Sequence, residues 1–255
     1  MLSAAKTVTS PRLAAARARR AVSALARPVG EFDASRYFRG SGELGFYNVG
    51  TIAVRHLARE IFRDHRGDWA VGDAVAFADD LIRDRYLEVK SVGIEVLSLY
   101  RRQFSPAQLA VWKRWLARND SANWASTDAI CGCLIGPLIV AHPSLAPRVA
   151  AWSNHRNLWV RRAPAVALIP PVRRGLALDL AYTVARALQG DREDLIQKAV
   201  GWMLREAGKR DGIRLERYLR QQGSATPRTT VRYAIERLPP RQRAAVLKAT
   251  RFRRT

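Results

Sequence analysis

The spacing of helix-breaking residues constrains the fold of this chain most strongly. From residue 31 onward, apolar residues recur three and four positions apart, which is the period of an amphipathic helix. Proline or glycine interrupts that pattern roughly every fifteen to twenty residues. The breaks fall at Gly67-Asp68, Ser105-Pro106, Pro137, His142-Pro143, Pro170-Pro171, Gly190-Asp191, Asp211-Gly212, Gly223 and Pro239-Pro240. Strand-like alternation between hairpin turns is missing from the sequence, so the pattern predicts an all-α fold.

Helices of roughly ten to eighteen residues in antiparallel pairs repeat at a period of roughly 35 to 40 residues, which is typical of helical solenoids. We therefore expect a superhelix of about six helix pairs, forming a single domain over residues 31–255. A concave face lined by Arg and Lys would fit a duplex. Within this domain Asp191 and Asp194 resemble a capping box, and the stretch from Gly208 to Gly212 supplies the matching helix end.

The charge of the chain points to a polyanionic partner. The 44 basic residues exceed the 22 acidic ones and give a net charge of +22, with a pI near 11.3. Only six of the basic residues are Lys, and Arg offers a planar fork of donors that suits phosphate. Nucleic acid is the first interpretation and an acidic membrane the second. A genome rich in G and C would also inflate the arginine content. We expect no membrane-spanning segment.

Cysteine and histidine indicate neither a disulfide framework nor a metal site. Cys131 and Cys133 form a C-x-C pair, whose side chains point in different directions on a helix, and no second pair completes a zinc site. The histidines are scattered along the chain, at His56, His65, His142 and His155. We therefore expect no metal or other cofactor, and reduced thiols in a cytosolic compartment.

The first thirty residues differ in composition from the remainder. They carry six basic residues, many Ala and Ser, and no acidic residue before Glu31. This composition fits an organellar transit peptide and equally a basic arm that lies along nucleic acid. We expect residues 1–30 to form a separate basic arm, helical or disordered. The expected location is the cytoplasm, in association with the nucleoid, or an organelle if the arm is a transit peptide.

Three predicted helices place a tryptophan beside a charged residue. Trp124 lies four residues before Asp128, so both project from one side of a helix. In the second set Trp159 lies three residues before Arg162, with Arg161 adjacent to Arg162. In the third set Lys198, Trp202 and Arg205 follow at spacings of four and three. Each set alone more often reflects core packing or a cation–π contact. Asp128 needs its own explanation, because a carboxylate ahead of the apolar run 131–140 is costly unless it caps, pairs or reacts.

Four segments resemble the AlkD-type DNA alkylation-repair glycosylases. The segment DLIQKAVGWMLREAGKRD, residues 194–211, resembles the most characteristic stretch of that family almost residue for residue. The segment NWASTDAICGCLIG looks like the catalytic helix of the family, NLWVRRAPAVAL like its W-[LV]-x-R helix, and SRYFRG like its early tyrosine segment. The match runs from about residue 31 to 250, in the right order.

The resemblance implies HEAT-like helical repeats that hold duplex DNA in a basic concave channel. Members of the family hydrolyse the N-glycosidic bond of cationic N3- and N7-alkylated purines without flipping the base. Carried over by position, Asp128 is the catalytic carboxylate, and Trp124 and Trp202 form the aromatic pair that contacts the lesion-bearing nucleotide. The residues then expected to contact DNA are Arg162 in the cleft, its neighbour Arg161, Lys198, Arg205 and Tyr37. We expect the protein to act on duplex DNA containing alkylated purines, as a monomer.

A single carboxylate suits this chemistry. Glycoside cleavage commonly uses two carboxylates, one of which protonates the leaving group. An alkylated purine already carries a positive charge, so its departure needs no general acid, and one carboxylate can stabilise the developing cationic sugar. The sequence departs from the family pattern at Asn123 and Ala125, where an aromatic and an acidic residue often stand, and over residues 39–50.

Three other interpretations compete with a catalytic role. A salt bridge from Asp128 to Arg161 or Arg162 would explain the carboxylate structurally. A non-catalytic helical-repeat protein that binds DNA or serves as a scaffold would keep the charge without needing Asp128. An adaptor for acidic proteins would need no aromatic cleft. Release of 7-methylguanine or 3-methyladenine from alkylated duplex DNA separates the enzyme from both binding proteins.

Overall fold

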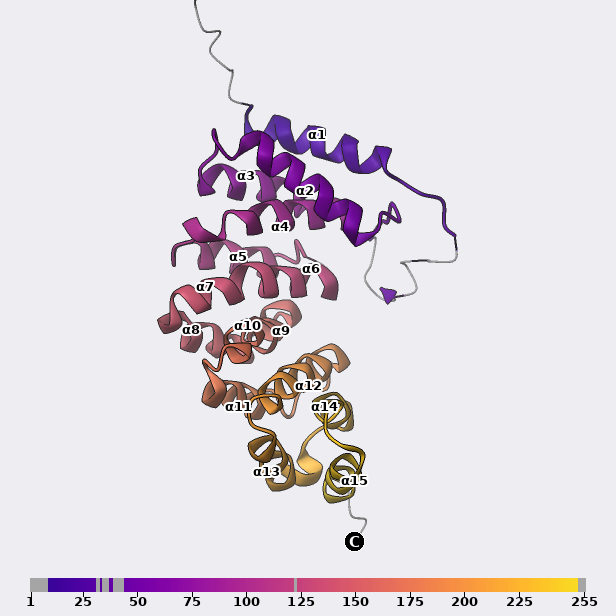
Figure 1. Cartoon of the computed structure of the whole chain (residues 1–255), viewed down its shortest axis with the longest axis vertical. Helices are drawn as coiled ribbons and strands as arrows, with labels where there is room; N and C mark the ends of the chain where they lie inside the picture. Colours follow the sequence, from indigo (N-terminus) through magenta and orange to yellow (C-terminus); the bar gives the residue numbers. More distant parts are fainter. Residues whose placement is uncertain (1–8, 31–32, 34–36, 39–43, 122, 252–255) are drawn as a thin grey trace, which may run out of the picture. The chain divides into compact units, whose positions relative to one another are not determined.

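The protein is helical throughout the part that the structure describes. The computed structural model describes residues 9–30, 33, 37–38, 44–121 and 123–251. In these residues there is no β-strand, and an isolated bridge joins Gly45 to Tyr86. The all-α prediction is therefore confirmed (Figure 1). The chain divides into two compact units, unit 1 over residues 1–134 and unit 2 over residues 135–255, and each is described by itself.

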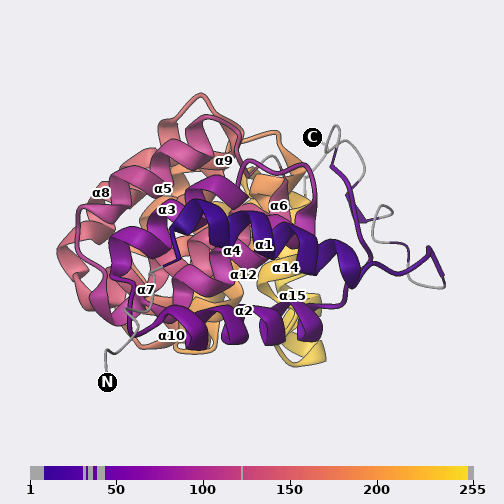
Figure 2. The same cartoon turned by 90° about the horizontal axis from the view of Figure 1, so that it is seen from above.

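Unit 1 is built around a pair of helices, α3 and α4, which pack along each other. Helix α1 lies on both of them, α2 packs on α4, and α4 also contacts α6 (Figure 1). Seen from above, α1 and α2 run alongside each other (Figure 2). Side chains of both helices line a shared pocket. The helices of unit 1 are α1 (Pro11–Ala24), α2 (Thr51–His65), α3 (Val71–Leu81), α4 (Leu87–Leu99), α5 (Gln108–Ala117) and α6 (Trp124–Ala129).

Helix α1 begins at a strong start signal and packs by a small-residue face. The Ser10 hydroxyl accepts a hydrogen bond from the amide of Leu13, and Pro11 occupies the first helical position, where its missing N–H costs nothing. Its buried residues are Ala14, Ala15, Ala18 and Val22. Part of the expected basic arm is thus a helix packed on α3 and α4. A domain boundary at residue 30 stays a prediction.

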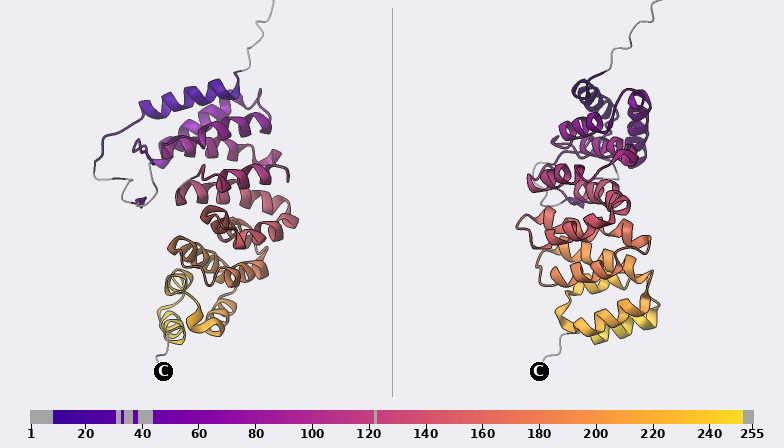
Figure 3. Two further views of the ribbon diagram at one scale, coloured as in Figure 1. Left: turned by 180° about the vertical axis from the view of Figure 1, so that it is seen from behind. Right: turned by 90° about the vertical axis from the view of Figure 1, so that its left-hand side faces the viewer.

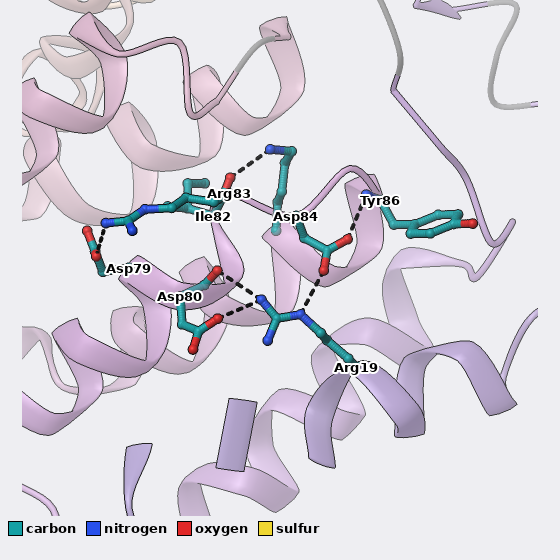
Figure 4. Close-up of polar contacts among 8 residues, drawn as sticks. Arg19, Asp79, Asp80, Ile82, Arg83, Asp84 and Tyr86 are labelled. Atoms are coloured by element: carbon teal, nitrogen blue, oxygen red, sulfur yellow. Dashed lines mark hydrogen bonds and ion pairs between the residues drawn. The ribbon is translucent and has the colours of Figure 1, made fainter. Parts of the chain in front are cut away.

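An arginine fastens α1 to the end of α3. The guanidinium of Arg19 lies 2.6 Å from a carboxylate oxygen of Asp80 and 2.8 Å from one of Asp84 (Figure 4). It also donates a hydrogen bond of 3.0 Å to the backbone carbonyl of Asp80.

A buried tryptophan contacts the same helix. The fully buried indole of Trp115 donates a hydrogen bond of 2.7 Å to the carboxylate of Asp79 in α3. Three of the seven tryptophans, Trp69, Trp112 and Trp115, are buried in the core of unit 1.

An apolar stretch of helix follows Trp124. It consists of α6, a π-helical segment over Ile130–Ile135 and α7 (Gly136–Ala141), and the boundary between the units falls inside it. Pro137 cannot donate to the carbonyl four residues earlier, which accounts for irregular helix beside it. Among the described residues, Trp124–Ala141 is the one helix long and apolar enough to cross a membrane. Half of it is buried inside the protein, and a core helix passes the same test.

Unit 2 is arranged around α12, which packs against α9, α10, α11, α13 and α14. Figure 3 shows α12 to α15 from two further sides, with α13 against α15. Gly201 permits the close approach of α14, because a Cβ atom there would lie 2.8 Å from the carbonyl oxygen of Thr230. The remaining helices of unit 2 are α8 (Ala146–Ala150), α9 (Leu158–Ala167), α10 (Ile169–Arg173), α11 (Leu178–Ala187), α12 (Asp194–Gly208), α13 (Gly212–Gln222), α14 (Arg228–Ala234) and α15 (Pro240–Ala249).

Most expected breaks coincide with helix ends, but two details differ. Helices α7, α8 and α10 have only five or six residues, because Pro137, Pro147 and Pro170 each restart a helix at its first or second position. The expected capping box is wrong, since α12 begins at Asp194 without a side-chain cap. Asp191 instead accepts from the amide of Glu193 in the preceding turn. The superhelical solenoid stays a prediction.

Candidate functional site

The helix that carries Trp124 and Asp128 begins at a buried cap. The Asn123 side-chain oxygen accepts a hydrogen bond of 2.8 Å from the amide of Ser126. Its amide nitrogen donates to the Ser121 carbonyl at 2.6 Å and to the Ser126 hydroxyl at 3.0 Å. Asn123 is thus the N-cap of α6, whose first residue is Trp124. Position 123 is the one at which the family pattern was expected to have an aromatic residue. Asp128, half-buried, follows one turn later on the same side of the helix.

The indole of Trp124 is held by the segment that contains Tyr37. Its Nε1–H donates a hydrogen bond of 3.1 Å to the backbone carbonyl of Tyr37. Its ring stacks on Phe38, with centroids 5.1 Å apart and planes 7° from parallel. The side chain of Tyr37 is itself 63% exposed. The structure therefore brings Tyr37 to Trp124 through its backbone carbonyl.

Two buried charged residues of α4 support this region. The carboxylate of Glu88 accepts hydrogen bonds from the amides of Tyr47, at 3.1 Å, and Val49, at 3.2 Å. The ammonium of Lys90 donates to the carbonyl of Ile82 at 2.6 Å and to that of Asp120 at 2.7 Å. Burial lowers the pKa of Lys90 to about 8. Sequence reasoning missed both, although LEVKSVGIEVLSL signals them as charges inside an otherwise apolar helix.

In unit 2, the two arginines of α9 make contacts within the protein. Arg162 exposes only 4% of its surface, and its guanidinium donates to the carbonyl of Leu195 in α12. Arg161 lies 2.6 Å from the carboxylate of Asp191 and also donates to the carbonyls of His155 and Arg156, at 2.9 and 3.0 Å. Both side chains thereby tie the start of α9 to the start of α12.

The predicted residues of α12 lie along one face of that helix. Trp202 is half-buried and stands between Lys198, one turn before it, and Arg205, nearly one turn after it. Lys198 lies 2.7 Å from Asp194, and this hydrogen bond raises the pKa of Lys198. Arg205 forms an ion pair with Glu236, which follows α14. Each of these two cations is thus paired with a carboxylate within unit 2.

The cysteines and histidines do not gather into a metal site in the described residues. Within these ranges, no group of three or more His, Cys, Asp or Glu residues could hold a metal ion. Cys131 is buried, Cys133 is half-buried, and neither forms a disulfide. Burial raises the pKa of the Cys133 thiol, so it stays protonated beyond its usual range. The Cys133 thiol therefore lacks the character of an activated nucleophile.

Comparison with known proteins identifies the family. The family model described as "DNA alkylation repair enzyme" matches residues 18–238. A solved structure from Enterococcus faecalis, described as a predicted DNA alkylation repair enzyme, superposes with a TM-score of 0.69 at 17% identity. The match covers 92% of this chain and all of the other, and at this identity it shows a shared fold. No curated protein matches the chain. The resemblance seen in the motifs is confirmed, and the chain belongs to the DNA alkylation repair enzyme family.

Proposed function

We propose that this protein is a DNA glycosylase that hydrolyses the N-glycosidic bond of cationic N3- or N7-alkylated purines in duplex DNA and leaves an abasic site. Family membership supports a role in DNA repair with DNA as substrate. The observation that carries the finer proposal is the pairing on α6 of a held indole, Trp124, with a carboxylate one turn later, Asp128. In this proposal the helices form a HEAT-like superhelix with a basic concave face, and the protein acts as a monomer.

The proposed reaction needs one carboxylate. The bond between C1′ and the purine nitrogen breaks, and its electron pair neutralises the charged base, which leaves as a neutral alkylpurine. The oxygen of water bonds to C1′, and a proton of that water passes to solvent or transiently to Asp128. Asp128 stabilises the cationic sugar as positive charge develops on it. The rings of Trp124 and Trp202 favour the cationic base through their quadrupoles.

The proposed DNA contacts divide into two kinds. The first kind comes from half-buried cations, which are Arg161, Lys198 and Arg205. Each is paired with a carboxylate, and exchange of that carboxylate for a phosphate brings the cation into contact with the DNA backbone. Arg162 is too deeply buried for a peripheral phosphate contact, and its burial supports a positioning role between α9 and α12. Tyr37 offers an exposed phenol beside Trp124.

The proposed location is the cytoplasm, where the protein acts on duplex DNA at the nucleoid. If residues 1–30 are a transit peptide, the proposed location is an organelle.

The test is release of 7-methylguanine or 3-methyladenine from alkylated duplex DNA by the wild type and by Asp128→Asn. A unit charge about 4 Å from the cationic sugar, at an effective dielectric near 20, stabilises it by roughly 4 kcal/mol. Excision by Asp128→Asn should therefore be on the order of a thousandfold slower. Asp64→Asn, which changes an exposed carboxylate of α2, is the matched control and should excise normally.

The competing proposal is a non-catalytic helical-repeat DNA-binding or scaffold protein. The cations of α9 and α12 favour it, because their charge does not depend on Asp128. Salt-dependent duplex binding without release of any alkylated base would establish it. A folded Asp128→Asn protein that excises within a few-fold of the wild type would instead show that another group is catalytic.

A further inference from the structure

Two aromatic rings, Phe38 and Phe46, lie in sequence behind Trp124, and the proposed contact of Trp124 with a lesion does not explain them. Phe38 stacks on one face of the indole, at 5.1 Å and 7°. Phe46 packs against Phe38, with ring centroids 5.2 Å apart and planes inclined by 42°. The nearly parallel, offset pair places Phe38 over part of one face of Trp124, which obstructs stacking of a nucleotide on that face.

The segment behind this stack is fastened at several points to α4 and to the turn before it. The amide of Gly45 donates to the carbonyl of Arg85 at 2.8 Å, and the carbonyl of Gly45 accepts from Leu87 at 3.0 Å. The ring of Tyr47 stacks on Tyr86, with centroids 3.9 Å apart.

The buried carboxylate of Glu88 accepts the amides that follow. It binds the N–H groups of Tyr47 and Val49, on either side of Asn48, and exposes only 5% of its surface. A buried carboxylate that receives several amide hydrogen bonds is costly to displace. Phe46 therefore projects from a backbone that is fixed on both sides, and it supports Phe38 from a rigid base.

We propose that Phe38 is a positioning residue that sets the plane of the Trp124 indole and restricts lesion contact to its uncovered face; this rests on the proposed glycosylase function. Two restraints act together. The ring of Phe38 fixes the tilt of the indole, and the carbonyl of Tyr37 fixes its rotation through the Nε1–H bond. With both in place, Trp124 meets the cationic base without losing side-chain freedom during the reaction.

The experiment compares Phe38→Leu with Phe62→Leu. Phe62 is also half-buried in unit 1 and forms an edge contact with Tyr100 at 5.0 Å, so the same substitution there removes an aromatic pair away from Trp124. Loss of an aromatic pair should slow single-turnover excision by roughly threefold to tenfold in Phe38→Leu only. Binding to undamaged duplex should match the wild type in both variants, and Phe38→Tyr should restore the rate.

A second measurement is independent of activity. The indole N–H resonance of Trp124, assigned by its absence from Trp124→Phe, should move in Phe38→Leu and stay in place in Phe62→Leu. Equal excision rates for the two Leu variants, or an unmoved resonance, would overturn the positioning role while the glycosylase stands. If the wild type releases no alkylated base, the proposed function fails and the positioning role fails with it, even where the resonance moves.

Discussion

Lys90 allows a prediction whose magnitude follows from the structure. Its ammonium group is 4% exposed and is held by the carbonyls of Ile82 and Asp120. Asp120 precedes the Asn123 cap by three residues, so Lys90 belongs to the framework that seats α6. Desolvation lowers the pKa of Lys90 from 10.5 to about 8, despite the opposing fields of Asp84 and Asp120. We consider the substitution Lys90→Met, which keeps an unbranched chain and removes the charge.

The sign of the effect follows from proton counting. Between pH 8 and 10.5 the unfolded chain keeps the Lys90 proton, whereas the folded protein has released it. The free energy of unfolding contributed by this group therefore rises with pH across that window. The full shift corresponds to about 3 kcal/mol. From pH 8 to pH 10, the wild type should gain about 2 kcal/mol relative to Lys90→Met.

Urea unfolding at pH 8, 9 and 10 measures this difference. Burial raises the pKa of Cys133 and raises the pKa of Tyr100 to about 12. Both groups destabilise the folded protein as pH rises, but both variants retain them, so their effects cancel in the difference. Lys209→Met, which removes a half-exposed lysine paired with Glu206 at 2.8 Å, is the control and should show no comparable rise. If the difference in free energy of unfolding between the wild type and Lys90→Met stays constant from pH 8 to pH 10, the lowered pKa of Lys90 is refuted.

Three further predictions concern DNA and α12. Trp202→Ala should reduce excision far more than binding to undamaged duplex; an equally large loss of thermal stability would assign this half-buried ring to the core. If about six phosphates are engaged, the logarithm of affinity should fall against the logarithm of salt concentration with a slope near −5, and a slope of zero would contradict binding through phosphate contacts. Gly201→Ala should lower the free energy of unfolding by about 1–3 kcal/mol, because its Cβ would meet the Thr230 carbonyl. In the same urea titration Gly72→Ala, with open space around it, should be neutral or slightly stabilising, and equal effects would contradict the close packing.

Helix positions could be predicted from the sequence because their signals are local. Asp211 caps α13 by accepting from the amide of Arg214 at 2.8 Å, as the Asp-Gly break indicated. The Trp124 and Asp128 spacing likewise predicted a shared helix side, and both residues lie on α6. These inferences need only chain geometry within about one turn, which residue type and periodicity determine.

The long-range contacts could not be predicted in the same way. Nothing in the residue pattern pairs Arg161 with Asp191, thirty positions away. The capping box was wrong because it placed the start of the helix at Asp191, whereas Glu193 stands at the N-cap of α12. The carbonyl of Tyr37 is a backbone group, so residue identity carries no sign that it binds Trp124. Glu88 and Lys90 were missed because isolated charges on a helix are usually solvated, and only the apolar residues around them indicate burial.

The two units hold their candidate residues by different means, and this has a consequence for mutagenesis. In unit 1, Trp124 is restrained by neutral contacts, a backbone carbonyl and a stacked ring, which salt does not screen. In unit 2, Lys198 and Arg205 are held by carboxylates at the surface, and ion pairs of that kind weaken as ionic strength rises. Substitutions around Trp124 should therefore change excision by a factor that is nearly independent of salt. Substitutions of Lys198 or Arg205 should act mainly on DNA affinity, and their effect should shrink as salt is added, because fewer counterions are released when one cation is missing.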